Sequence, residues 1–465
     1  MHIVLVSTPL IFSQKTEPYF PLGILNLHRI LSDSGHDCRI YAPQEKAINK
    51  IDPNIMIQRW AAEIAATNPD WIGYSTMCGS YPLILLLAKR VKHILPQSCN
   101  VLGGPQASVV ADKTITAFPW IDFIIRGEAE SVIQDFAGAI AGKVKTHEVS
   151  NLTYRENGKT FSTPMSLHLK DLDFLPLPDY QAYPHFKSAL FGEDFGINED
   201  SIPLEAGRGC PYACSFCSTS NFWQRRRRQK SPDLLVEQIK SVAHKYKINA
   251  VTLRQDLFAI EGDWLSDFLR LKEAHNDIIW SCSLRADSVS TQTFAKMQRV
   301  GCRNIFFGIE SGSQRVQKLI GKNLNISKTK ETIEAAVACG ISVETGFIIG
   351  FPWETGDDIQ DTLSLHQHFL KIGVEYSHLS MLCPLPKTQI TNQYSSQLML
   401  DPVEFAHTTN FEYVRNSEID QMIRQYPQIF SSFYYVKTEF LSRKELFFAV
   451  RAANALSAFE RAVKS

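Results

Sequence analysis

The stretch GRGCPYACSFCST, residues 207–219, places three cysteines within eight positions, at Cys210, Cys214 and Cys217. A closed structural zinc site takes four ligands, and no histidine lies within twenty residues on either side of this stretch. A disulfide would leave one of the three thiols over. Iron–sulfur ligation fits better, because three thiolates on a four-iron cluster leave one iron open to a small molecule.

The composition of the chain points to a reducing compartment. Ten cysteines in 465 residues are not disulfide-dense, and most stand alone in the sequence. The formal net charge is zero, so nothing in the overall charge favours nucleic acid or an anionic membrane. No run of about 18 apolar residues exists, and the apolar start lacks a basic segment and a cleavage site. We therefore expect a cytoplasmic protein that binds neither nucleic acid nor a membrane.

The first ~140 residues alternate between strand-like and helix-like patterns, which predicts a doubly wound parallel sheet. Ligands of such sheets bind at the carboxyl ends of the strands, where small or polar loops follow here. The expected strands are 2–7, 38–42, 71–76, 100–104 and 121–130, the helices are 22–35, 55–69 and 81–96, and the loops are 7–10, 75–81, 103–108 and 126–130.

A second alternating series begins at residue 201, and its six β/α units predict a partial (β/α)6 TIM-type barrel with its ligands at the C-terminal mouth. Its expected strands are 202–206, 250–255, 278–284, 304–310, 342–350 and 375–381, with helices at 233–246 and 329–340 among them. A proline- and aromatic-rich connector precedes the barrel. The fold class is therefore α/β, and the expected segments are a Rossmann-like domain at 1–145, a connector at 146–200, the barrel at 201–385 and a C-terminal helical cap at 386–465.

The cysteine pattern, with aromatic Phe216 ahead of the third cysteine, resembles the signature of the radical SAM enzymes. The resemblance implies that Cys210, Cys214 and Cys217 bind a [4Fe-4S] cluster whose open iron chelates S-adenosylmethionine (SAM). One electron then cleaves the S–C5′ bond, and the resulting 5′-deoxyadenosyl radical abstracts hydrogen from the substrate. A reductase, flavodoxin or ferredoxin would supply that electron.

The resemblance covers most of residues 201–390. GCRNIFFGIESGSQRV (301–316) looks like the strand that contacts SAM through its glutamate, and GFIIGFPWET (346–355) resembles the strand beside the adenine. SCSLRADS (281–288) resembles the family's ribose and carboxylate contacts. The residues that this resemblance assigns to SAM are Phe216, Asp256, Ser283, Arg285, Glu310, Gly346 and Gly350.

The N-terminal segment resembles the cobalamin (B12)-binding domain that is often fused to this class. Loops 75–80 and 103–108 would line the corrin and its nucleotide tail. The D-x-H-x-x-G motif that gives cobalt a histidine in other B12 proteins is absent, so cobalamin would bind without one. The alternative is a domain that packs on the barrel or holds substrate. The assigned residues are Ser75, Thr76, Gly79, Gly103, Gly104, Gly127 and Glu128.

Both resemblances together imply cobalamin-dependent C-methylation of an unactivated carbon in a natural product or peptide. One SAM would methylate cobalt, and a second would generate the radical. The alternative is a radical cyclisation, rearrangement, epimerisation or excision without net methylation. A cobalamin or iron–sulfur sensor is a third reading, but no helix-turn-helix or strongly basic domain supports a regulator.

Several features stay open at this stage. The run Arg225–Arg228 is either a solvated face or a contact for an anion or a substrate leader. The aromatic patch 411–440 either packs on the barrel or forms a substrate wall. Cys282 and Cys383 fall near the predicted barrel mouth; Cys383 is either a buried inert thiol or a group that quenches a radical or touches substrate.

Overall fold

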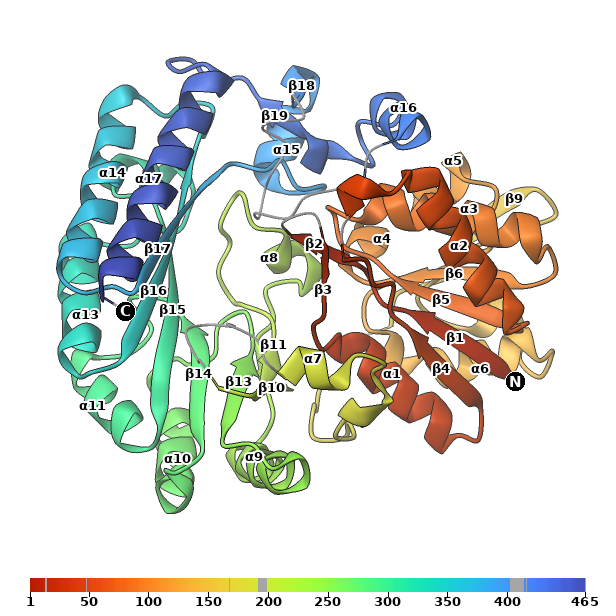
Figure 1. Cartoon of the computed structure of the whole chain (residues 1–465), viewed down its shortest axis with the longest axis horizontal. Coiled ribbons are helices and arrows are strands. Elements are labelled where there is room, and N and C mark those ends of the chain that lie inside the picture. Colours follow the sequence, from red (N-terminus) through yellow and green to blue (C-terminus); the bar gives the residue numbers. More distant parts are fainter. Residues whose placement is uncertain are drawn as a thin grey trace.

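The structure is a computed structural model that describes residues 1–12, 15–46, 48–166, 168–190, 199–401, 414 and 416–464. Figure 1 shows an N-terminal domain on the right and a second sheet with its helices on the left, with helix α8 (Ser218–Phe222) between them. Within the expected connector and aromatic patch, residues 191–198, 411–413 and 415 lie outside the described residues.

The N-terminal domain is built on a seven-stranded sheet in the order β4-β1-β5-β6-β7-β8-β9. Its first five strands in the chain are parallel, and they lie in the spatial order second, first, third, fourth, fifth. The spatial order of the strands therefore reverses between β1 and β5. In sheets of this kind, a ligand crevice lies at the carboxyl ends of the two strands where the order reverses. The strands are β1 (His2–Val6), β4 (Asp37–Tyr41), β5 (Trp71–Ser75), β6 (Cys99–Gly103), β7 (Phe123–Ile125), β8 (Leu152–Glu156) and β9 (Lys159–Ser162).

Helices cover both faces of this sheet, and apolar side chains pack between the layers. The first half of α3 is buried on all sides, because the sequence places a continuous run of leucines and isoleucines there. The helices are α1 (Leu22–Asp33), α2 (Pro53–Ala66), α3 (Tyr81–Ile94), α4 (Pro105–Val109), α5 (Ala111–Ala117) and α6 (Ile133–Ile140), and a small hairpin joins β2 (Leu10–Phe12) and β3 (Lys15–Glu17).

Two details of the N-terminal domain differ from the sequence-based expectation. The sheet continues past residue 145, because β8 pairs antiparallel with β7 and β9 pairs with β8. This hairpin covers an edge of β7 that would otherwise expose unpaired backbone groups. The expected loop 103–108 is in large part the start of α4, since Pro105 stands at a first helical position, where proline fits.

The second sheet has six parallel strands in chain order, as predicted for a partial barrel. Within the described residues, β10 and β17 form its two edges and do not pair with each other. The strands are β10 (Ser201–Glu205), β13 (Ala250–Arg254), β14 (Ile279–Leu284), β15 (Cys302–Glu310), β16 (Ser342–Ile349) and β17 (Tyr376–Met381). The helices between them are α9 (Pro232–Tyr246), α10 (Asp263–Lys272), α11 (Thr291–Arg299), α12 (Gln314–Leu319), α13 (Ile326–Ala338) and α14 (Gly356–Lys371).

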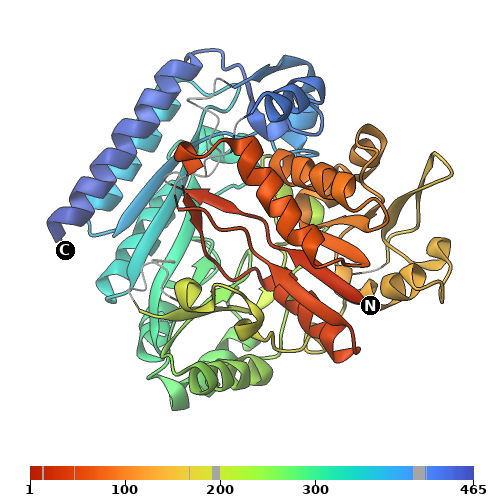
Figure 2. The ribbon, with the colours of Figure 1, turned by 45° about the vertical axis from the view of Figure 1, so that its right-hand side comes forward.

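The C-terminal helix α17 (Arg443–Lys464) covers the edge strand β17 of the barrel sheet rather than its mouth (Figure 2). The Asn454 side chain accepts a hydrogen bond from Leu379 N at 2.9 Å and donates one to Leu379 O at 2.9 Å. Ser457 Oγ accepts a hydrogen bond from Ser377 N at 3.0 Å. The helix thus satisfies backbone groups that an uncovered edge strand would present to solvent.

The aromatic patch packs on the N-terminal domain and not on the barrel, which corrects the expectation. Phe430 lies 5.9 Å from Tyr81 of α3, measured between ring centroids, and 6.3 Å from Phe118. Tyr434 and the buried face of α16 (Ser417–Gln425) belong to the same hydrophobic cluster as the N-terminal sheet. The C-terminal segment therefore ties both domains together. In the part of the chain that is described, no helix is long and apolar enough to cross a membrane.

Candidate functional site

A cavity of about 610 Å³ lies between the two domains. Its walls come from the carboxyl ends of β1, β5, β6 and β7 on one side and from α8 and its flanking loops on the other. Five of the residues assigned to cobalamin line it: Ser75, Gly103, Gly104, Gly127 and Glu128.

Thr76 and Gly79, the other two, do not line this cavity. Thr76 instead fixes the loop behind it, because its hydroxyl donates to Gly103 O at 2.7 Å and accepts from Ala107 N at 3.0 Å. A side chain on Gly104, whose φ is +96°, would approach Thr76 O to 2.9 Å. Glycine is therefore needed where these two loops meet.

The cavity fits a large ligand with a flat apolar face and polar edges, as a corrin has. Its floor includes Leu5, Val101 and Leu102, whereas Ser75 and Gln106 supply polar groups at the side. No histidine is among the residues that line it, in keeping with the missing histidine motif. Its volume is within the range of small-molecule and cofactor sites.

The three cysteines lie in the loop between β11 (Gly207–Arg208) and α8, and all three thiols are free and half-buried. Gly209 begins this loop at φ +84°, and a Cβ on it would lie 2.0 Å from Arg226 O. Asp256 Oδ2 accepts a hydrogen bond from Gly209 N at 2.9 Å. Ser215 N donates to Ile320 O at 2.8 Å, so backbone contacts hold the loop at both ends.

The three free thiols of this loop provide one thiolate for each of three irons of a [4Fe-4S] cluster. Nowhere in the described ranges do three His, Cys, Asp or Glu side chains gather closely enough to bind one ion. A [4Fe-4S] cluster places each thiolate on its own iron, so its ligands stand further apart. Burial raises the pKa of Cys214 to about 11, and the Lys322 ammonium opposes that rise. A thiol of this kind needs a metal to become a thiolate at neutral pH.

Lys322 is a site residue that the sequence analysis missed. Its Nζ lies 2.7 Å from Glu310 Oε1, and its charge also lowers the pKa of Cys210. Glu310 has a left-handed backbone with φ +70°, which is uncommon for a residue with a side chain and is often found at functional sites. For Lys322, the only sequence signal was its position between Gly321 and Asn323, and both of these neighbours have a left-handed backbone in the structure.

Arg285 and Phe216, which the resemblance assigned to SAM, both contact other side chains of the protein. Arg285 Nε donates to Asp287 Oδ1 at 2.6 Å, and its guanidinium lies 4.0 Å from the centre of the Tyr212 ring within the cysteine loop. The Phe216 ring contacts Phe351 at 6.0 Å between centroids and belongs to a local hydrophobic cluster. Both side chains brace the loop.

The glycines assigned to SAM stand where a side chain would clash or strain the chain. A Cβ on Gly346 would lie 2.9 Å from the Phe306 ring, and Gly350 has φ +91°. Glu354, which the resemblance left without a role, holds this turn through Gly350 N at 2.6 Å and Phe351 N at 3.2 Å. Burial raises the pKa of Glu354 to about 8.

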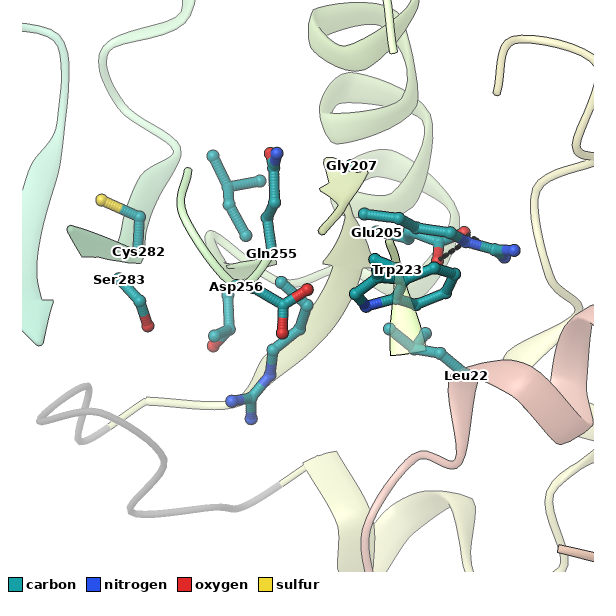
Figure 3. Close-up of a pocket in the computed structure, with 12 residues that line it drawn as sticks. Leu22, Glu205, Gly207, Trp223, Gln255, Asp256, Cys282 and Ser283 are labelled. Atoms are coloured by element: carbon teal, nitrogen blue, oxygen red, sulfur yellow. Dashed lines mark hydrogen bonds and ion pairs between the residues drawn. The ribbon is translucent and has the colours of Figure 1, made fainter. Parts of the chain in front are cut away.

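A second chamber of about 320 Å³ opens at the carboxyl ends of β10, β13 and β14 (Figure 3). Ser283 lines it, and so does Asp256, whose carboxyl points into the space that Figure 3 shows. Burial raises the pKa of Asp256. The residues that line both this chamber and the inter-domain cavity are Leu22, Glu205, Arg208, Trp223 and Asp256.

A buried arginine joins the two domains at this boundary. Arg208 Nη1 lies 2.8 Å from Glu128 Oε1, Nη2 lies 2.6 Å from Glu130 Oε1, and Nε lies 2.6 Å from Glu205 Oε1. Burial alone would raise the pKa of Glu128, but Arg228 and Arg208 hold it below its usual range. Glu128, which the resemblance assigned to cobalamin, therefore forms ion pairs at the domain interface. Sequence motifs gave no signal for Arg208.

The arginine run divides into two parts. Arg225 and Arg226 are exposed, as a solvated face would be. Arg227 donates to Leu257 O at 3.0 Å and Phe258 O at 2.7 Å, and burial lowers its pKa to about 10. Arg228 Nη1 lies 2.9 Å from Glu128 Oε2 across the interface.

The two leftover cysteines make ordinary protein contacts. Cys282 lines the second chamber but is 2% exposed, and its thiol neighbours that of buried Cys302. Cys383 Sγ donates to Ser432 O at 3.7 Å. These contacts favour the reading of both as packed thiols.

Comparison with known proteins gives matches for both domains. The family described as the radical SAM superfamily matches residues 204–366, and the B12 binding domain family matches residues 14–137. An uncharacterised methyltransferase of Pyrococcus horikoshii is 27% identical over 371 residues, covering 80% of this chain and 77% of the relative. An anaerobic magnesium-protoporphyrin IX monomethyl ester cyclase of Cereibacter sphaeroides is 24% identical, covering 73% and 56%.

Among solved structures, the radical SAM methyltransferase TsrM of Kitasatospora setae, with cobalamin and a [4Fe-4S] cluster bound, has the same fold. Its TM-score is 0.73 at 14% identity, over 97% of this chain and 91% of TsrM. The radical SAM domain implies a [4Fe-4S] cluster and SAM, and the N-terminal domain implies cobalamin. The chain therefore carries a B12-binding domain at residues 14–137 ahead of a radical SAM domain at residues 204–366.

Proposed function

We propose that this enzyme methylates an unactivated carbon of a small-molecule substrate, using SAM and cobalamin. The observation that carries the proposal is the shared wall of the inter-domain cavity and the second chamber, which brings a B12-side ligand next to a barrel-side ligand. The Pyrococcus horikoshii relative and TsrM, both described as methyltransferases, support the same chemistry.

When bound, the cluster supplies the electron that cleaves SAM, and cobalamin carries the methyl group. Each methylation consumes two SAM molecules: one becomes S-adenosylhomocysteine, and the other yields methionine and 5′-deoxyadenosine. We assign Cys210, Cys214 and Cys217 to the cluster, because they are the half-buried free thiols that one tightly held loop carries. The radical SAM domain would extend over 201–385 and the cobalamin domain over 1–145 together with the β8–β9 hairpin.

The remaining residues orient the ligands and keep water away. We assign Ser283, Glu310, and Gly346 and Gly350 at the carboxyl end of β16 to SAM contacts, in agreement with the sequence motifs. Arg285, Phe216 and Asp256 act as positioning residues, since each is bonded to or packed against the cysteine loop or its support. Arg208 holds the inter-domain wall in place through its three carboxylate partners.

The first experiment is anaerobic reconstitution with iron, sulfide and hydroxocobalamin, followed by iron and cobalt analysis and an absorption spectrum. We expect about four irons per chain, as three thiolates on a four-iron cluster require, and near-stoichiometric cobalt. Replacing Cys210, Cys214 and Cys217 with alanine should abolish iron binding and leave cobalt unchanged. Cys339→Ala, a free thiol at the end of α13, is the matched control and should retain both metals.

Incubation of the reconstituted enzyme with SAM and a reductant then separates the two candidate reactions. Methyl transfer requires S-adenosylhomocysteine in addition to 5′-deoxyadenosine. Formation of 5′-deoxyadenosine without S-adenosylhomocysteine would contradict methylation and support a radical cyclisation, rearrangement, epimerisation or excision. The similarity to the Cereibacter sphaeroides cyclase keeps this second candidate in view.

The partners that follow from this function are an electron donor and a substrate. A reductase, flavodoxin or ferredoxin would deliver electrons to the cluster in a reducing compartment, for which we propose the cytoplasm. A natural product fits the chamber better than a peptide does, because about 320 Å³ holds only a small molecule. We propose no nucleic-acid partner, since the net charge is zero.

A further inference from the structure

A row of polar side chains crosses the inner wall of the barrel sheet at one level. Thr252 of β13 pairs in register with Ser281 of β14, Ser281 pairs with Asn304 of β15, and Asn304 pairs with Ser342 of β16. Register partners on neighbouring strands point to the same face of a sheet. The inside of a parallel barrel is normally filled by bulky branched apolar side chains, so this polar row departs from ordinary barrel packing.

Three members of the polar row have a buried polar atom without a hydrogen-bond partner among the described residues. These atoms are Thr252 Oγ1, Ser281 Oγ and Asn304 Oδ1. Thr252 is 2% exposed, and the other two residues are fully buried. Leaving such a group unpaired costs about 1–3 kcal/mol, and buried polar groups in native proteins rarely lack a partner. Asn304 uses only its amide nitrogen, which donates to Ser342 Oγ at 3.1 Å.

Thr252 brings the polar row to the second chamber, whose wall it forms together with Ser283. At its other end, the chamber shares Leu22 and Trp223 with the inter-domain cavity (Figure 3). A molecule in this chamber would therefore lie between the residues assigned to SAM and the cavity assigned to cobalamin. That is where a carbon must lie in order to lose hydrogen and receive a methyl group.

The charged side chains of the chamber already have partners inside the protein. Glu205 is bonded to Arg208 at 2.6 Å, and Asp256 accepts from the Gly209 amide at 2.9 Å. Arg254 makes an interaction of its own as well. The hydrogen-bonding capacity left over in this wall and in the row behind it is therefore neutral: two hydroxyls, the amide oxygen of Asn304 and the amide nitrogen of Gln255.

We infer that the second chamber binds the substrate, and that the end of the substrate next to β13 carries neutral hydroxyl or carboxamide groups that pair with Thr252 and Gln255, the two residues that line the chamber with an unpartnered polar atom. The inference rests on the proposed function and adds the chemical class of its substrate. A charged group at this end would have to displace an existing ion pair, and an apolar group would leave these two polar atoms unpaired.

Four probes that share one ring test this inference: cyclohexane-1,2-diol, cyclohexanecarboxamide, cyclohexanecarboxylate and cyclohexylammonium. Each is titrated into the anaerobic, iron- and cobalt-loaded enzyme, and binding is read from the thermal unfolding midpoint. We expect the two neutral probes to raise the midpoint and the two charged probes to leave it unchanged. Better binding of either charged probe, or no shift with any probe, would overturn the inference.

Thr252→Val assigns the binding to the wall of the second chamber. This substitution replaces an unpartnered hydroxyl with a methyl group, so the midpoint of the probe-free enzyme should rise while affinity for the neutral probes falls at least tenfold. Ser281→Ala removes an unpartnered hydroxyl of the row that does not line the chamber, and it should bind the probes like the wild type. Ser98→Ala removes a buried unpartnered hydroxyl outside the chamber and should bind the probes like the wild type. Equal probe binding by Thr252→Val and wild type would contradict the inference.

The failure of this inference and of the proposed function can be told apart. Without any probe, the wild-type enzyme either forms S-adenosylhomocysteine from SAM or does not, and that result tests methyl transfer alone. Iron and cobalt contents of Thr252→Val show whether the variant is loaded. If Thr252→Val contains iron and cobalt and still binds the neutral probes, the substrate assignment is wrong, even when methyl transfer is observed.

Discussion

Lys322 places a positive charge beside two of the three thiols assigned to the cluster. Burial raises the pKa of both Cys210 and Cys214, and the Lys322 ammonium, itself paired with Glu310, partly offsets that rise. A nearby cation favours the more negative, reduced state of a cluster. Lys322→Gln should therefore shift the cluster midpoint potential to more negative values, by an amount on the order of tens of millivolts. An electron paramagnetic resonance redox titration measures this shift.

Lys318→Gln is the control for this prediction, because Lys318 is exposed on α12, the helix that ends at Leu319, shortly before Lys322. Its potential should match that of the wild type. If Lys322→Gln and Lys318→Gln have the same cluster midpoint potential, the Lys322 ammonium has no electrostatic role at the cluster. The Lys322–Glu310 pair then only supports the loop.

Glu354 makes the stability of the turn after β16 depend on pH. Its pKa is raised from 4.5 to about 8 by burial, so the folded state holds a proton that the unfolded state releases. Its contribution to stability is complete below pH 4.5 and is lost as the pH rises to about 8. Glu354→Gln keeps a neutral hydrogen-bond acceptor at this position. The free energy of unfolding of the variant, relative to that of the wild type, should therefore rise as the pH increases from 4.5 to about 8.

Urea denaturation at pH 5, 6.5 and 8 measures that difference, which should reach a few kcal/mol at the highest pH. Glu439→Gln, at an exposed position, is the control and should give no trend. A constant difference between wild type and Glu354→Gln at all three pH values would show that the carboxyl is ionised when folded.

The residues of the site differ in how far the sequence could reveal them. Cys210 and its two partners form a motif because one short loop carries all three. Lys322 and Arg208 belong to no motif, since their partners lie on other elements and only the fold brings them together. Arg285 was expected at SAM, but its aromatic and acidic neighbours hold it against the cysteine loop.

The edge of the barrel sheet depends on one side chain of α17. Asn454 pairs with both the N–H and the C=O of Leu379 in β17. Asn454→Leu would leave these two half-buried backbone groups unpaired, at a cost of about 1–3 kcal/mol. We expect a lower urea midpoint and an increased tendency to aggregate through the uncovered edge. Light scattering and urea titration check both effects.

Ala455→Ser is the control for the helix itself, because Ala455 is exposed on α17 and does not reach β17. It should lower stability by only a few tenths of a kcal/mol, as a change of helix propensity does. If Asn454→Leu behaves like this control, the edge of β17 is protected by the apolar packing of α17 alone.

Whole elements were easier to predict than their boundaries. The strands of both sheets carry short β-branched or apolar runs between helices, so all eleven of the parallel strands expected were found. The β8–β9 hairpin was missed because β9 is exposed throughout and has no alternating pattern. The aromatic patch was assigned to the wrong domain because aromatic content reveals burial and not the partner surface.

At the scale of the whole molecule, Arg208 fixes the two domains to each other. Its side chain is 6% exposed and contacts three carboxylates, two of which belong to the N-terminal domain. Arg208→Gln would leave Glu130 and Glu205 without this cation and Glu128 with Arg228 alone, and breaking a buried ion pair costs about 3–5 kcal/mol. We expect a lower unfolding midpoint, faster proteolysis of the 146–200 segment and a larger radius of gyration in solution scattering.

Arg225→Gln is the control, since Arg225 is exposed in the nearby arginine run. It should leave the midpoint, the proteolysis rate and the radius unchanged. Should Arg208→Gln lose stability without any change in radius or proteolysis, the arginine would stabilise its own loop rather than the contact between domains.

The same arginine limits how such enzymes can be recombined. Arg208 stands two positions before Cys210, while Glu128 and Glu130 belong to the other domain. In a chimera that receives a foreign N-terminal domain, that domain must therefore bring a compatible acidic pair. Otherwise the recipient's barrel meets a mismatched surface directly beside its cysteine loop. The two halves match two different domain families, yet at this contact they can only change together.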